Sequence, residues 1–309
     1  MGKTAFVFPG QGAQAVGMGK DVYDAVPAAR EIFDKANRML DLALTDLIFN
    51  GPDDMLKQTA NTQPALLTTS YALYQAFAEK GIKPDYVAGH SLGEYSALVV
   101  AGVLSFEDAV ALVRKRGEFM EQAVPNGEGA MAAVLGANRE GLGALCDDIT
   151  AVTGTSVEMA NLNAPGQIVV SGTTAGVQAV MERGKEVGAK RVIPLEVSGP
   201  FHSTLMKPAA ERLNVALSEA DFEDAEIPVV ANVSARAEQS GERLRELLVE
   251  QVFSPVLWED SVQYMIAQGV DTFIEIGSGS VLAGLIKKIN RSVKVVSLNS
   301  LEAIQAYEG

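Results

Sequence analysis

The sequence predicts an α/β protein with a mostly parallel sheet, and a repeated unit carries that prediction. Short apolar segments at residues 4–8, 85–89 and 272–276 are each followed by a glycine-containing turn and then by helix-prone sequence. Strands that alternate with helices pair in parallel, and helices cover both faces of the sheet. The 309 residues are 48% hydrophobic, which allows a large core in one large or two modest domains.

The first apolar segment ends at Pro9, so it is too short for a signal peptide or a membrane-spanning helix. Phe6 occupies the Ser/Thr place of a myristoylation signal, and no later segment reaches about 18 uninterrupted apolar residues. The single Cys146 excludes an internal disulfide, and its acidic neighbours disfavour a thiolate nucleophile. We therefore expect a soluble cytoplasmic protein.

The second unit contains a candidate nucleophile. Residues 89–93 form a G-x-S-x-G pattern between an apolar strand and the helix-prone residues 94–100. In a nucleophile elbow, small flanking residues allow a sharp strand-to-helix turn that exposes the serine beside free helix N–H groups. The alternative is a tight turn whose serine only caps the helix. We predict an α/β-hydrolase-like core with Ser91 as its nucleophile.

A helix predicted to start at Ser105 places an arginine among apolar residues. Its apolar stripe runs at spacings of three and four through Ala109, Leu112 and Val113, and Arg116 falls on the same stripe. Arg114 and Lys115 fall off the stripe and are expected to reach solvent. A buried guanidinium needs an anionic partner, and its planar fork suits a carboxylate. Either a protein carboxylate or a substrate carboxylate, such as that of a malonyl group, answers this need.

The middle of the chain predicts a separate subdomain. Strands at 131–135, 157–160, 167–171 and 190–195 and helices at 139–150 and 175–187 follow the order β-α-β-β-α-β. This order is that of a ferredoxin-like unit. Pro and Gly cluster near residues 125–127 and 198–200, which are plausible junctions. We predict a discontinuous catalytic domain, 1–127 and 198–309, with a ferredoxin-like subdomain inserted at 128–197.

The serine needs a base, and the chain has only two histidines. His90 adjoins Ser91 and is poorly placed to accept its proton, because neighbouring side chains there point in different directions. His90 is expected to shape the elbow. His202 remains, in a Gly- and Pro-containing loop, and the order serine-then-histidine matches elbow enzymes. A triad would add a carboxylate, but the 39 acidic residues give no way to choose one.

The formal charge of −14 disfavours nucleic acid or an anionic membrane as the main partner, because both require a basic surface. A ligand that carries phosphate must then find a local cationic patch. Docking of an acidic protein partner would likewise need a basic patch, for which Lys287, Lys288 and Arg291 are candidates, followed by Lys190 and Arg191. The same charges also fit an ordinary solvated helix face.

Five motifs, in order and spread over the chain, together resemble the malonyl-CoA:acyl-carrier-protein transacylases of bacterial fatty acid synthesis. They are Phe8-Pro9-Gly10-Gln11-Gly12, Gln63-Pro64-Ala65, Gly89-His90-Ser91-Leu92-Gly93-Glu94-Tyr95, Arg116-Gly117 and Phe201-His202-Ser203. A turn that is usually Gly-Pro-Gly in this family is Gly277-Ser278-Gly279 here, which puts only the local loop shape in doubt.

The resemblance implies a role for each matching residue. Ser91 would be the nucleophile, His202 the base, and Arg116 the group that binds the malonyl carboxylate. A main-chain carbonyl, at Gln251, would orient the histidine in place of an acid. The oxyanion would meet the backbone N–H groups of Gln11 and Leu92, while Gln63 and Phe201 would contact substrate, with Phe201 excluding an α-methyl branch.

The implied reaction is a ping-pong transfer of malonyl from malonyl-CoA, through a malonyl-serine, to the phosphopantetheine thiol of acyl carrier protein. The expected partners are thus coenzyme A and an acidic carrier protein. We expect no bound cofactor, no metal and a monomer.

Three other functions compete with this one. Gly10, Gly12 and Ala15 fit a dinucleotide fingerprint, which predicts a nicotinamide oxidoreductase, but the acid-ending second strand is missing because residues 28–40 look helical. A hydrolase would use the same elbow with water as acceptor. A non-enzymatic acyl-binding protein would need neither the exposed serine nor a base.

Overall fold

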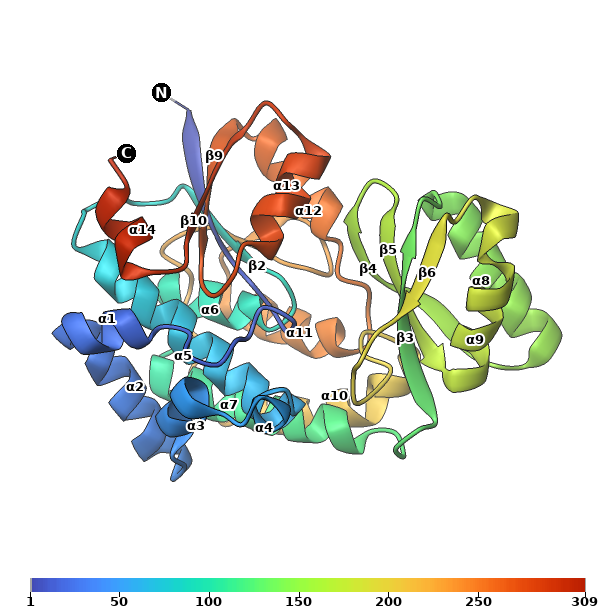
Figure 1. Cartoon of the computed structure of the whole chain (residues 1–309), viewed down its shortest axis with the longest axis horizontal. Coiled ribbons are helices and arrows are strands. Elements are labelled where there is room, and N and C mark those ends of the chain that lie inside the picture. The colour runs from blue at the N-terminus through green and yellow to red at the C-terminus, as the bar shows by residue number, and fades with distance from the viewer. Residues whose placement is uncertain (1, 309) are drawn as a thin grey trace.

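The computed structural model describes residues 2–308 and consists of a larger part, built on a six-stranded sheet, and a smaller part, built on a four-stranded sheet (Figure 1). The large sheet has the order β10 (Lys294–Leu298), β9 (Val270–Ile276), β1 (Lys3–Phe8), β2 (Tyr86–Gly89), β7 (Val229–Val230) and β8 (Ala237–Glu238). All neighbours pair in parallel except β7 with β8 at the edge. The predicted mostly parallel sheet is confirmed.

Helices pack against both faces of this sheet. They are α1 (Lys20–Ala25), α2 (Pro27–Leu40), α3 (Leu44–Asn50), α4 (Asp53–Leu56), α5 (Thr59–Ala78), α6 (Gly93–Val100), α7 (Phe106–Gln122), α10 (Lys207–Ser218), α11 (Gly241–Val252), α12 (Trp258–Ala267), α13 (Val281–Ile289) and α14 (Leu301–Ala306), with the 3-10 turn η2 (Thr204–Met206). Among residues 2–308, no helix combines the length and apolar character needed to cross a bilayer.

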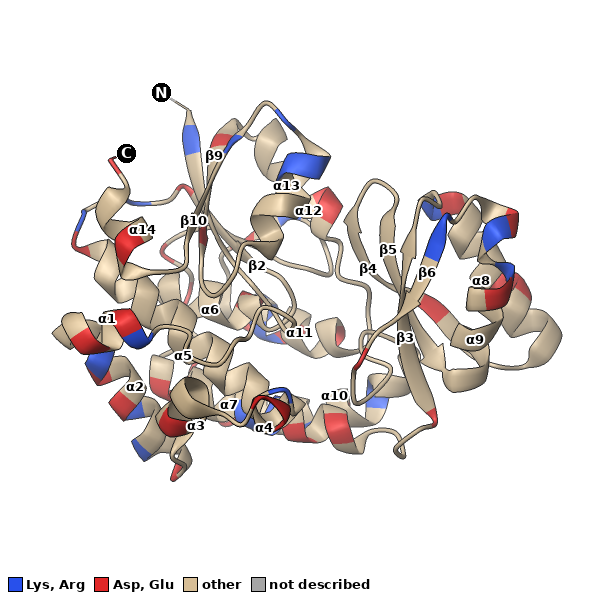
Figure 2. Ribbon diagram, viewed as in Figure 1, with Lys and Arg blue, Asp and Glu red and all other residues tan. Residues whose placement is uncertain are grey.

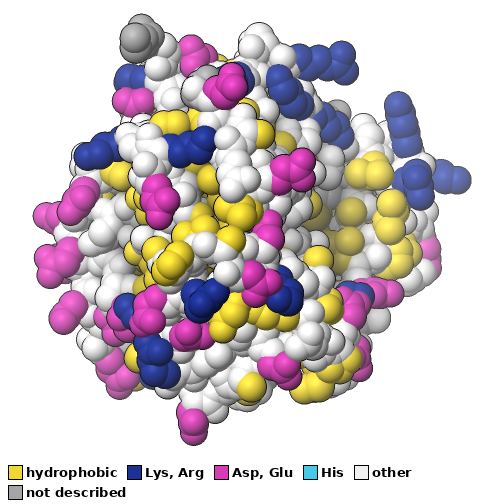
Figure 3. All heavy atoms as spheres, turned by 60° about the vertical axis from the view of Figure 1, so that its left-hand side comes forward, with side chains coloured by type: hydrophobic (Ala, Val, Ile, Leu, Met, Phe, Trp, Pro, Cys, Tyr) yellow, Lys and Arg dark blue, Asp and Glu magenta, His cyan; other side chains and the backbone are white. Residues whose placement is uncertain are grey.

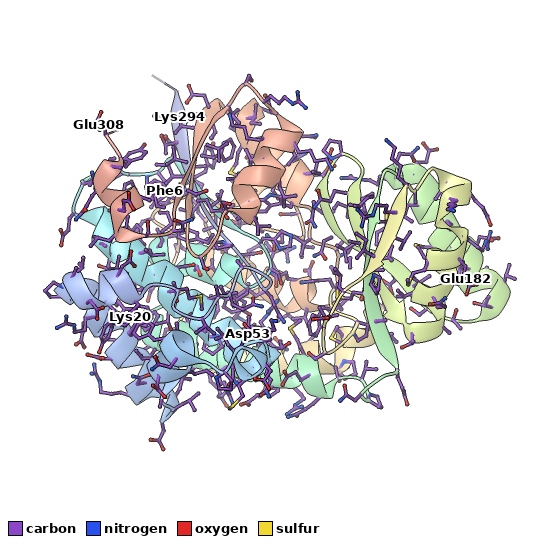
Figure 4. All side chains as sticks on the ribbon, viewed as in Figure 1. Phe6, Lys20, Asp53, Glu182, Lys294 and Glu308 are labelled. Carbon is purple, nitrogen blue, oxygen red and sulfur yellow. The ribbon has the colours of Figure 1, made fainter. Side chains whose placement is uncertain are left out.

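The alternation of side chains along β1 explains the two covered faces. Phe6 and Phe8 belong to the core beneath α2, α5, α6 and α7, whereas Ala5 and Val7 belong to a second core beneath α12 and α13. Successive strand residues point to opposite faces, so a strand buried on both sides is apolar throughout. Figure 4 shows Phe6 among packed side chains and Glu182 at the outer side of the smaller part.

The smaller part contains β3 (Gly129–Leu135), α8 (Arg139–Thr153), β4 (Val157–Ala164), β5 (Gln167–Thr173), α9 (Thr174–Arg183), the 3-10 turn η1 (Gly184–Val187) and β6 (Arg191–Pro194). Its strands are antiparallel in the order β4-β5-β3-β6. A third core, including Val134, Leu145 and Val170, lies between this sheet and α8 and α9. The elements follow the predicted β-α-β-β-α-β order.

Several predicted boundaries shift. The helix expected at 175–187 ends at Arg183 and continues only as the 3-10 turn η1. Gly184 lies at the junction, and its low helix propensity favours the end of the α-helix there. The strand expected at 157–160 runs to Ala164, because β5 offers pairing partners along its whole length. The helix-prone sequence expected after residues 272–276 forms helix α13.

The parallel sheet brings two of the predicted site residues to the carboxyl ends of its strands. The carboxyl ends of β1 and β2 lie side by side, because Phe8 pairs with Gly89. The loops that follow these two strands contain Gln11 and Ser91. Ligands of open parallel sheets bind outside the carboxyl ends of the strands, where such loops meet.

Candidate active site

Ser91 lies in a sharp turn between β2 and α6, as the G-x-S-x-G pattern predicts. Its φ angle is 51°, in the left-handed region that non-glycine residues rarely adopt. A Cβ at Gly89 would lie 1.9 Å from the carbonyl carbon of Gly93, and a Cβ at Gly93 would lie 2.1 Å from the carbonyl oxygen of Phe8. The backbone approaches itself this closely only because both flanking residues are glycines.

Asn232, after β7, anchors the turn from the other side. The backbone N–H of Ser91 donates to Asn232 Oδ1 over 2.7 Å, and Asn232 Nδ2 donates to the carbonyl of Gly89 over 2.6 Å. Asn232 is fully buried. One amide side chain therefore supplies both a donor and an acceptor to the strained turn, which stabilises a conformation that is costly on its own.

His202 lies beside the serine, although 111 residues separate them in the chain: Ser91 Oγ is 2.7 Å from His202 Nε2. The other ring nitrogen, Nδ1, is 2.7 Å from the main-chain carbonyl of Gln251, near the end of α11. A carbonyl only accepts hydrogen bonds, so Nδ1 carries the proton and Nε2 is left to accept from the serine. His202 is therefore in the tautomer that a general base for Ser91 would need.

The pKa of His202 is lowered to about 3, chiefly because burial disfavours the charged imidazolium and secondly because Arg116 adds positive charge nearby. His202 is therefore neutral at neutral pH, which is the form that accepts a proton. Its φ of 57° is also left-handed, so both members of the pair have strained backbones, as is common at functional sites.

Arg116 is 1% exposed and lies on the buried face of α7, as its spacing predicts. Its Nη1 donates to Gln63 Oε1 over 2.8 Å, and its Nη2 donates to Gln251 Oε1 over 2.9 Å and to Ser91 Oγ over 3.1 Å. Its Nε has no hydrogen-bond partner. Within residues 2–308, no carboxylate lies within ion-pair distance of this guanidinium.

The neighbouring Arg114 reaches solvent only in part. The helical spacing lets it face solvent, and its side chain is 30% exposed. Its Nη1 donates to the carbonyl of Ala60 over 3.1 Å and to Asn61 Oδ1, while Nε pairs with Glu118. The first turn of α5 packs against α7 and covers this position, which the sequence of α7 alone does not reveal. Lys115 is exposed as predicted.

A pocket of about 110 Å³ opens beside the serine. It is lined by Gln11, His90, Ser91, Leu92, Arg116, Met120, Met131, Asn161, Leu195, Val197, Phe201 and His202. A second pocket of about 290 Å³ shares Gln11, His90, Asn161 and Leu195 with it and extends to the start of α13. The two pockets therefore adjoin, the inner one at the serine and the outer one at α13. Phe201 is buried in the wall of the inner pocket.

The backbone N–H groups of Gln11 and Leu92 have no hydrogen-bond partner in the described chain. Both residues line the inner pocket next to Ser91. The side chain of Gln11 is tied to Thr59 Oγ1 over 3.1 Å, which fixes its loop. Two unpaired N–H donors beside a nucleophile are the components of an oxyanion hole.

His90 lines the same pocket, but its ring contacts residues other than Ser91 and His202. Its Nε2 is 2.7 Å from Asn163 Oδ1 of β4, and its ring packs at 5.7 Å on the ring of Trp258. Burial lowers the pKa of His90. The contact connects the elbow to the smaller part of the molecule, in line with a role in shaping the turn.

The structure gives no support to a dinucleotide-binding site or to a cysteine nucleophile. Residues 27–40 form helix α2 where a dinucleotide fold needs a second strand. Burial raises the pKa of the Cys146 thiol to about 12, far from the thiolate that a nucleophile needs. Among the described residues, no group of three His, Cys, Asp or Glu side chains is placed to hold a metal ion.

Two residues of the site escaped the sequence reasoning. Asn232 follows a two-residue strand without any motif. The sequence does contain a signal for Glu94, because Glu94 is the only charged residue in the otherwise mostly apolar α6. It is 1% exposed, and its Oε2 accepts from Asn232 N over 3.0 Å and from Gln251 Nε2 over 2.9 Å.

Comparison with known proteins gives a consistent result. A family model described as an acyl transferase domain matches residues 5–303. The malonyl CoA-acyl carrier protein transacylase of Bacillus subtilis (strain 168) is 57% identical over 305 residues, covering 99% of this chain and 96% of the relative. The protein of the same name from Staphylococcus aureus (strain MRSA252) is 50% identical over 307 residues, covering 99% of both.

Solved structures agree. An acyl carrier protein S-malonyltransferase from Vibrio cholerae superposes with a TM-score of 0.96 at 44% identity, covering 98% of this chain and 99% of that one. A malonyl-transacylase in complex with a type II PKS acyl-carrier protein superposes with a TM-score of 0.95 at 42% identity, covering 98% of both chains.

Proposed function

The chain belongs to the acyl transferase domain family, as a member of the malonyl CoA-acyl carrier protein transacylases, and we propose that it works by a ping-pong mechanism through a malonyl-Ser91 intermediate. The observation that carries this mechanism is the chain of hydrogen bonds from Ser91 Oγ through His202 to the carbonyl of Gln251, with Arg116 on the same serine oxygen. Nucleophile, base and carboxylate-binding group thus meet at one atom.

In the first half-reaction, Ser91 Oγ attacks the thioester carbonyl carbon of malonyl-CoA while His202 Nε2 takes the hydroxyl proton. The resulting oxyanion accepts hydrogen bonds from the free N–H groups of Gln11 and Leu92, each worth about 3–4 kcal/mol in comparable sites. The C–S bond then breaks, His202 returns the proton to the departing thiolate, and coenzyme A leaves. The serine carries the malonyl ester.

The second half-reaction reverses these roles. His202 removes the proton of the phosphopantetheine thiol of acyl carrier protein, and the thiolate attacks the malonyl ester. The C–O bond to Ser91 breaks, and the serine regains a proton from His202. No proton or electron is left over, so the proposed reaction needs no redox cofactor, and malonyl-CoA enters only as substrate.

Arg116 is the proposed ligand of the malonyl carboxylate. Its guanidinium lies in the pocket without a carboxylate of the protein at ion-pair distance among the described residues. Gln63 and Gln251 hold it from two sides with neutral oxygens, so a free anion would meet a fixed and unneutralised cation. Phe201 narrows the same pocket, and we propose that it excludes a methyl branch on the acyl group.

The proposed route for the carrier protein arm is the outer pocket, which reaches Val281, Leu282 and Leu285 of α13. Exposed basic residues flank it at the end of α13, at Lys287, Lys288 and Arg291, and at the start of β6, at Lys190 and Arg191 (Figure 2). Figure 3 shows Lys and Arg side chains on both sides of a hollow with hydrophobic walls. Such a surface suits an acidic partner.

Two of these lysines also donate hydrogen bonds within the protein. Lys287 Nζ donates to the carbonyl of Val293, and Lys288 Nζ donates to Gln167 Oε1 over 3.3 Å. Gln167 lines the outer pocket, so Lys288 lies at its mouth. Substitution of Lys287 would also remove its hydrogen bond to Val293, so substitution of Lys288 is the better test of carrier-protein docking.

The architecture belongs to the same proposal. The strand order β4-β5-β3-β6 supports a ferredoxin-like unit at 128–197, inserted into an α/β-hydrolase-like domain at 1–127 and 198–309, whose first and last residues lie outside the described part. A cytoplasmic location and a monomeric state stay predictions.

The test is intact-mass measurement after incubation with malonyl-CoA. The wild type should gain the mass of one malonyl group, and Ser91→Ala should gain none. A Ser91→Ala protein that still gains this mass would end the serine assignment.

A further inference from the structure

A single carboxylate is buried at the centre of the site without a direct cationic partner. Glu94 is the only charged residue of α6 and is 1% exposed. Burying a carboxylate is costly unless its charge and its lone pairs are satisfied. The same site contains a buried cation, Arg116, which also lacks a direct counter-charge among residues 2–308.

One side chain connects the two. Gln251 Nε2 donates to Glu94 Oε2 over 2.9 Å, while Gln251 Oε1 accepts from Arg116 Nη2 over 2.9 Å. The carboxamide is therefore held between an anion at its donor end and a cation at its acceptor end. Hydrogen bonds to charged groups are stronger than those between neutral groups, and bonds in series polarise one another.

The surroundings allow only one orientation of this carboxamide. Besides Glu94, its Nε2 faces the carbonyl oxygen of Ser91 at 3.1 Å and Asn232 Oδ1 at 3.2 Å. A rotated amide would place its oxygen against three acceptors and its nitrogen against a guanidinium. The main-chain carbonyl of the same residue accepts from His202. Gln251 thus connects the base, the elbow and the arginine.

We propose that Glu94 is a positioning residue, whose negative charge, acting through the Gln251 carboxamide, holds the Arg116 guanidinium aimed at the acyl group. This inference rests on the proposed function, because it concerns how Arg116 meets the malonyl carboxylate. Glu94 touches neither substrate nor the reacting atoms. Its effect should consequently appear in reactions that use Arg116 and vanish in those that do not.

The Glu94 carboxyl group is expected to titrate near neutral pH. Burial raises the pKa of Glu94 to about 7, while the hydrogen bonds from Asn232 and Gln251 and the positive charge of Arg116 on α7 oppose that rise. Tyr95, its neighbour on α6, is the other titratable group coupled to it, and burial raises the pKa of Tyr95 well above its ordinary value, so it stays neutral. Above about pH 7 the carboxylate is ionised.

The experiment compares the rates of Ser91 acylation by malonyl-CoA and by acetyl-CoA, which has no carboxylate for Arg116. Glu94→Gln keeps an acceptor oxygen for Asn232 and Gln251 but removes the charge. It should lower the malonyl rate roughly tenfold more than the acetyl rate, the size expected for one charge-assisted bond. Glu94→Asp, which keeps the charge, should recover part of the preference.

The matched control is Glu275→Gln. Glu275 is also buried, and burial raises its pKa, but its oxygens accept from the backbone N–H groups of Leu282 and Ala283, away from Arg116. Its substitution should change both acylation rates by the same factor. The wild type supplies a test free of folding effects: its malonyl-to-acetyl ratio should fall as the pH drops from about 8 to about 6, because Glu94 becomes protonated.

Equal losses for the two thioesters in Glu94→Gln, or a wild-type ratio that does not change with pH, would overturn the role of Glu94. A wild type that malonyl-CoA never labels would instead refute the proposed function. The two failures are therefore told apart by the first measurement.

Discussion

Arg116 Nη2 donates a hydrogen bond to Ser91 Oγ over 3.1 Å, so the guanidinium and the proposed nucleophile are in contact before any acyl group arrives. The same Oγ lies 2.7 Å from His202 Nε2. Arg116 also lowers the basicity of His202 by its charge. A substrate carboxylate that engages Arg116 would neutralise this charge at the moment when His202 must accept a proton.

Arg116→Ala should therefore abolish the preference for malonyl-CoA over acetyl-CoA. The acylation rate with malonyl-CoA is expected to fall by roughly 10- to 100-fold, since a hydrogen bond to a charged group is worth about 1.5–3 kcal/mol. The rate with acetyl-CoA should change much less. Parallel acylation assays check this, and unchanged selectivity would rule out the carboxylate role.

The stability of the protein should depend on pH through His202. Because its pKa is lowered to about 3 in the folded state, the folded protein binds fewer protons than the unfolded chain between about pH 6.5 and pH 3. The contribution of His202 is complete above its ordinary pKa and decreases as the pH falls, by at most about 1.4 kcal/mol per pH unit.

Denaturant unfolding of the wild type and His202→Gln at several pH values measures this slope. Glu94 opposes it, because a raised pKa contributes most at low pH and loses its contribution as the pH rises from about 4.5 to about 7. The difference between wild type and His202→Gln isolates the histidine. A difference that does not vary between pH 6.5 and pH 4.5 would contradict the burial argument.

Gly89→Ala should disrupt the elbow. The new methyl group would meet the carbonyl carbon and oxygen of Gly93, both at 1.9 Å, and backbone atoms have little room to move. A loss of about 1–3 kcal/mol in the free energy of unfolding is expected, together with loss of Ser91 acylation.

Gly284→Ala is the matched control for this change. Gly284 lies inside α13, where a methyl group would meet nothing within 4 Å. Alanine is the better helix former by about 1 kcal/mol, so this variant should be more stable than the wild type. Thermal unfolding measures both, and effects of the same sign would refute the steric explanation.

Charge reversal of Lys288 should weaken recognition of the carrier protein. Lys288→Glu is expected to raise the apparent KM for acyl carrier protein, with little change in acylation by malonyl-CoA, because rim charges act on association. Lys83→Glu serves as control. Lys83 is exposed and precedes the amino end of β2, whereas Ser91 follows the carboxyl end of this strand. The same KM in both variants would remove Lys288 from the docking surface.

The proposed transferase is separated from a hydrolase by its acceptor. Malonyl-Ser91 should pass its acyl group to carrier protein much faster than it releases free malonate, because the pocket around Ser91 is small and largely apolar in its lining. Mass spectrometry of the preformed malonyl-enzyme, with and without carrier protein, measures both rates. Release of malonate at an equal rate would favour the hydrolase.

The local features of the site were predictable from the sequence because each depends on near neighbours. Two glycines, each two residues from Ser91, predict the turn, and a helical spacing places Arg116 on a buried face. The scarcity of histidine leaves His202 as the base. The alternation of strands and helices predicts a mostly parallel sheet.

Only the tertiary structure decided how these parts connect. Every residue has a main-chain carbonyl, so no pattern in the sequence singles out that of Gln251 as the partner of His202; the family resemblance supplied it, and the packing of α11 puts it at 2.7 Å. Asn232 and Glu94 belong to distant segments, and the Asn232 backbone N–H meets the Glu94 carboxylate only after folding. Hydrogen bonds depend on distance and direction in space, and segments far apart in the chain acquire both only when the core brings them together.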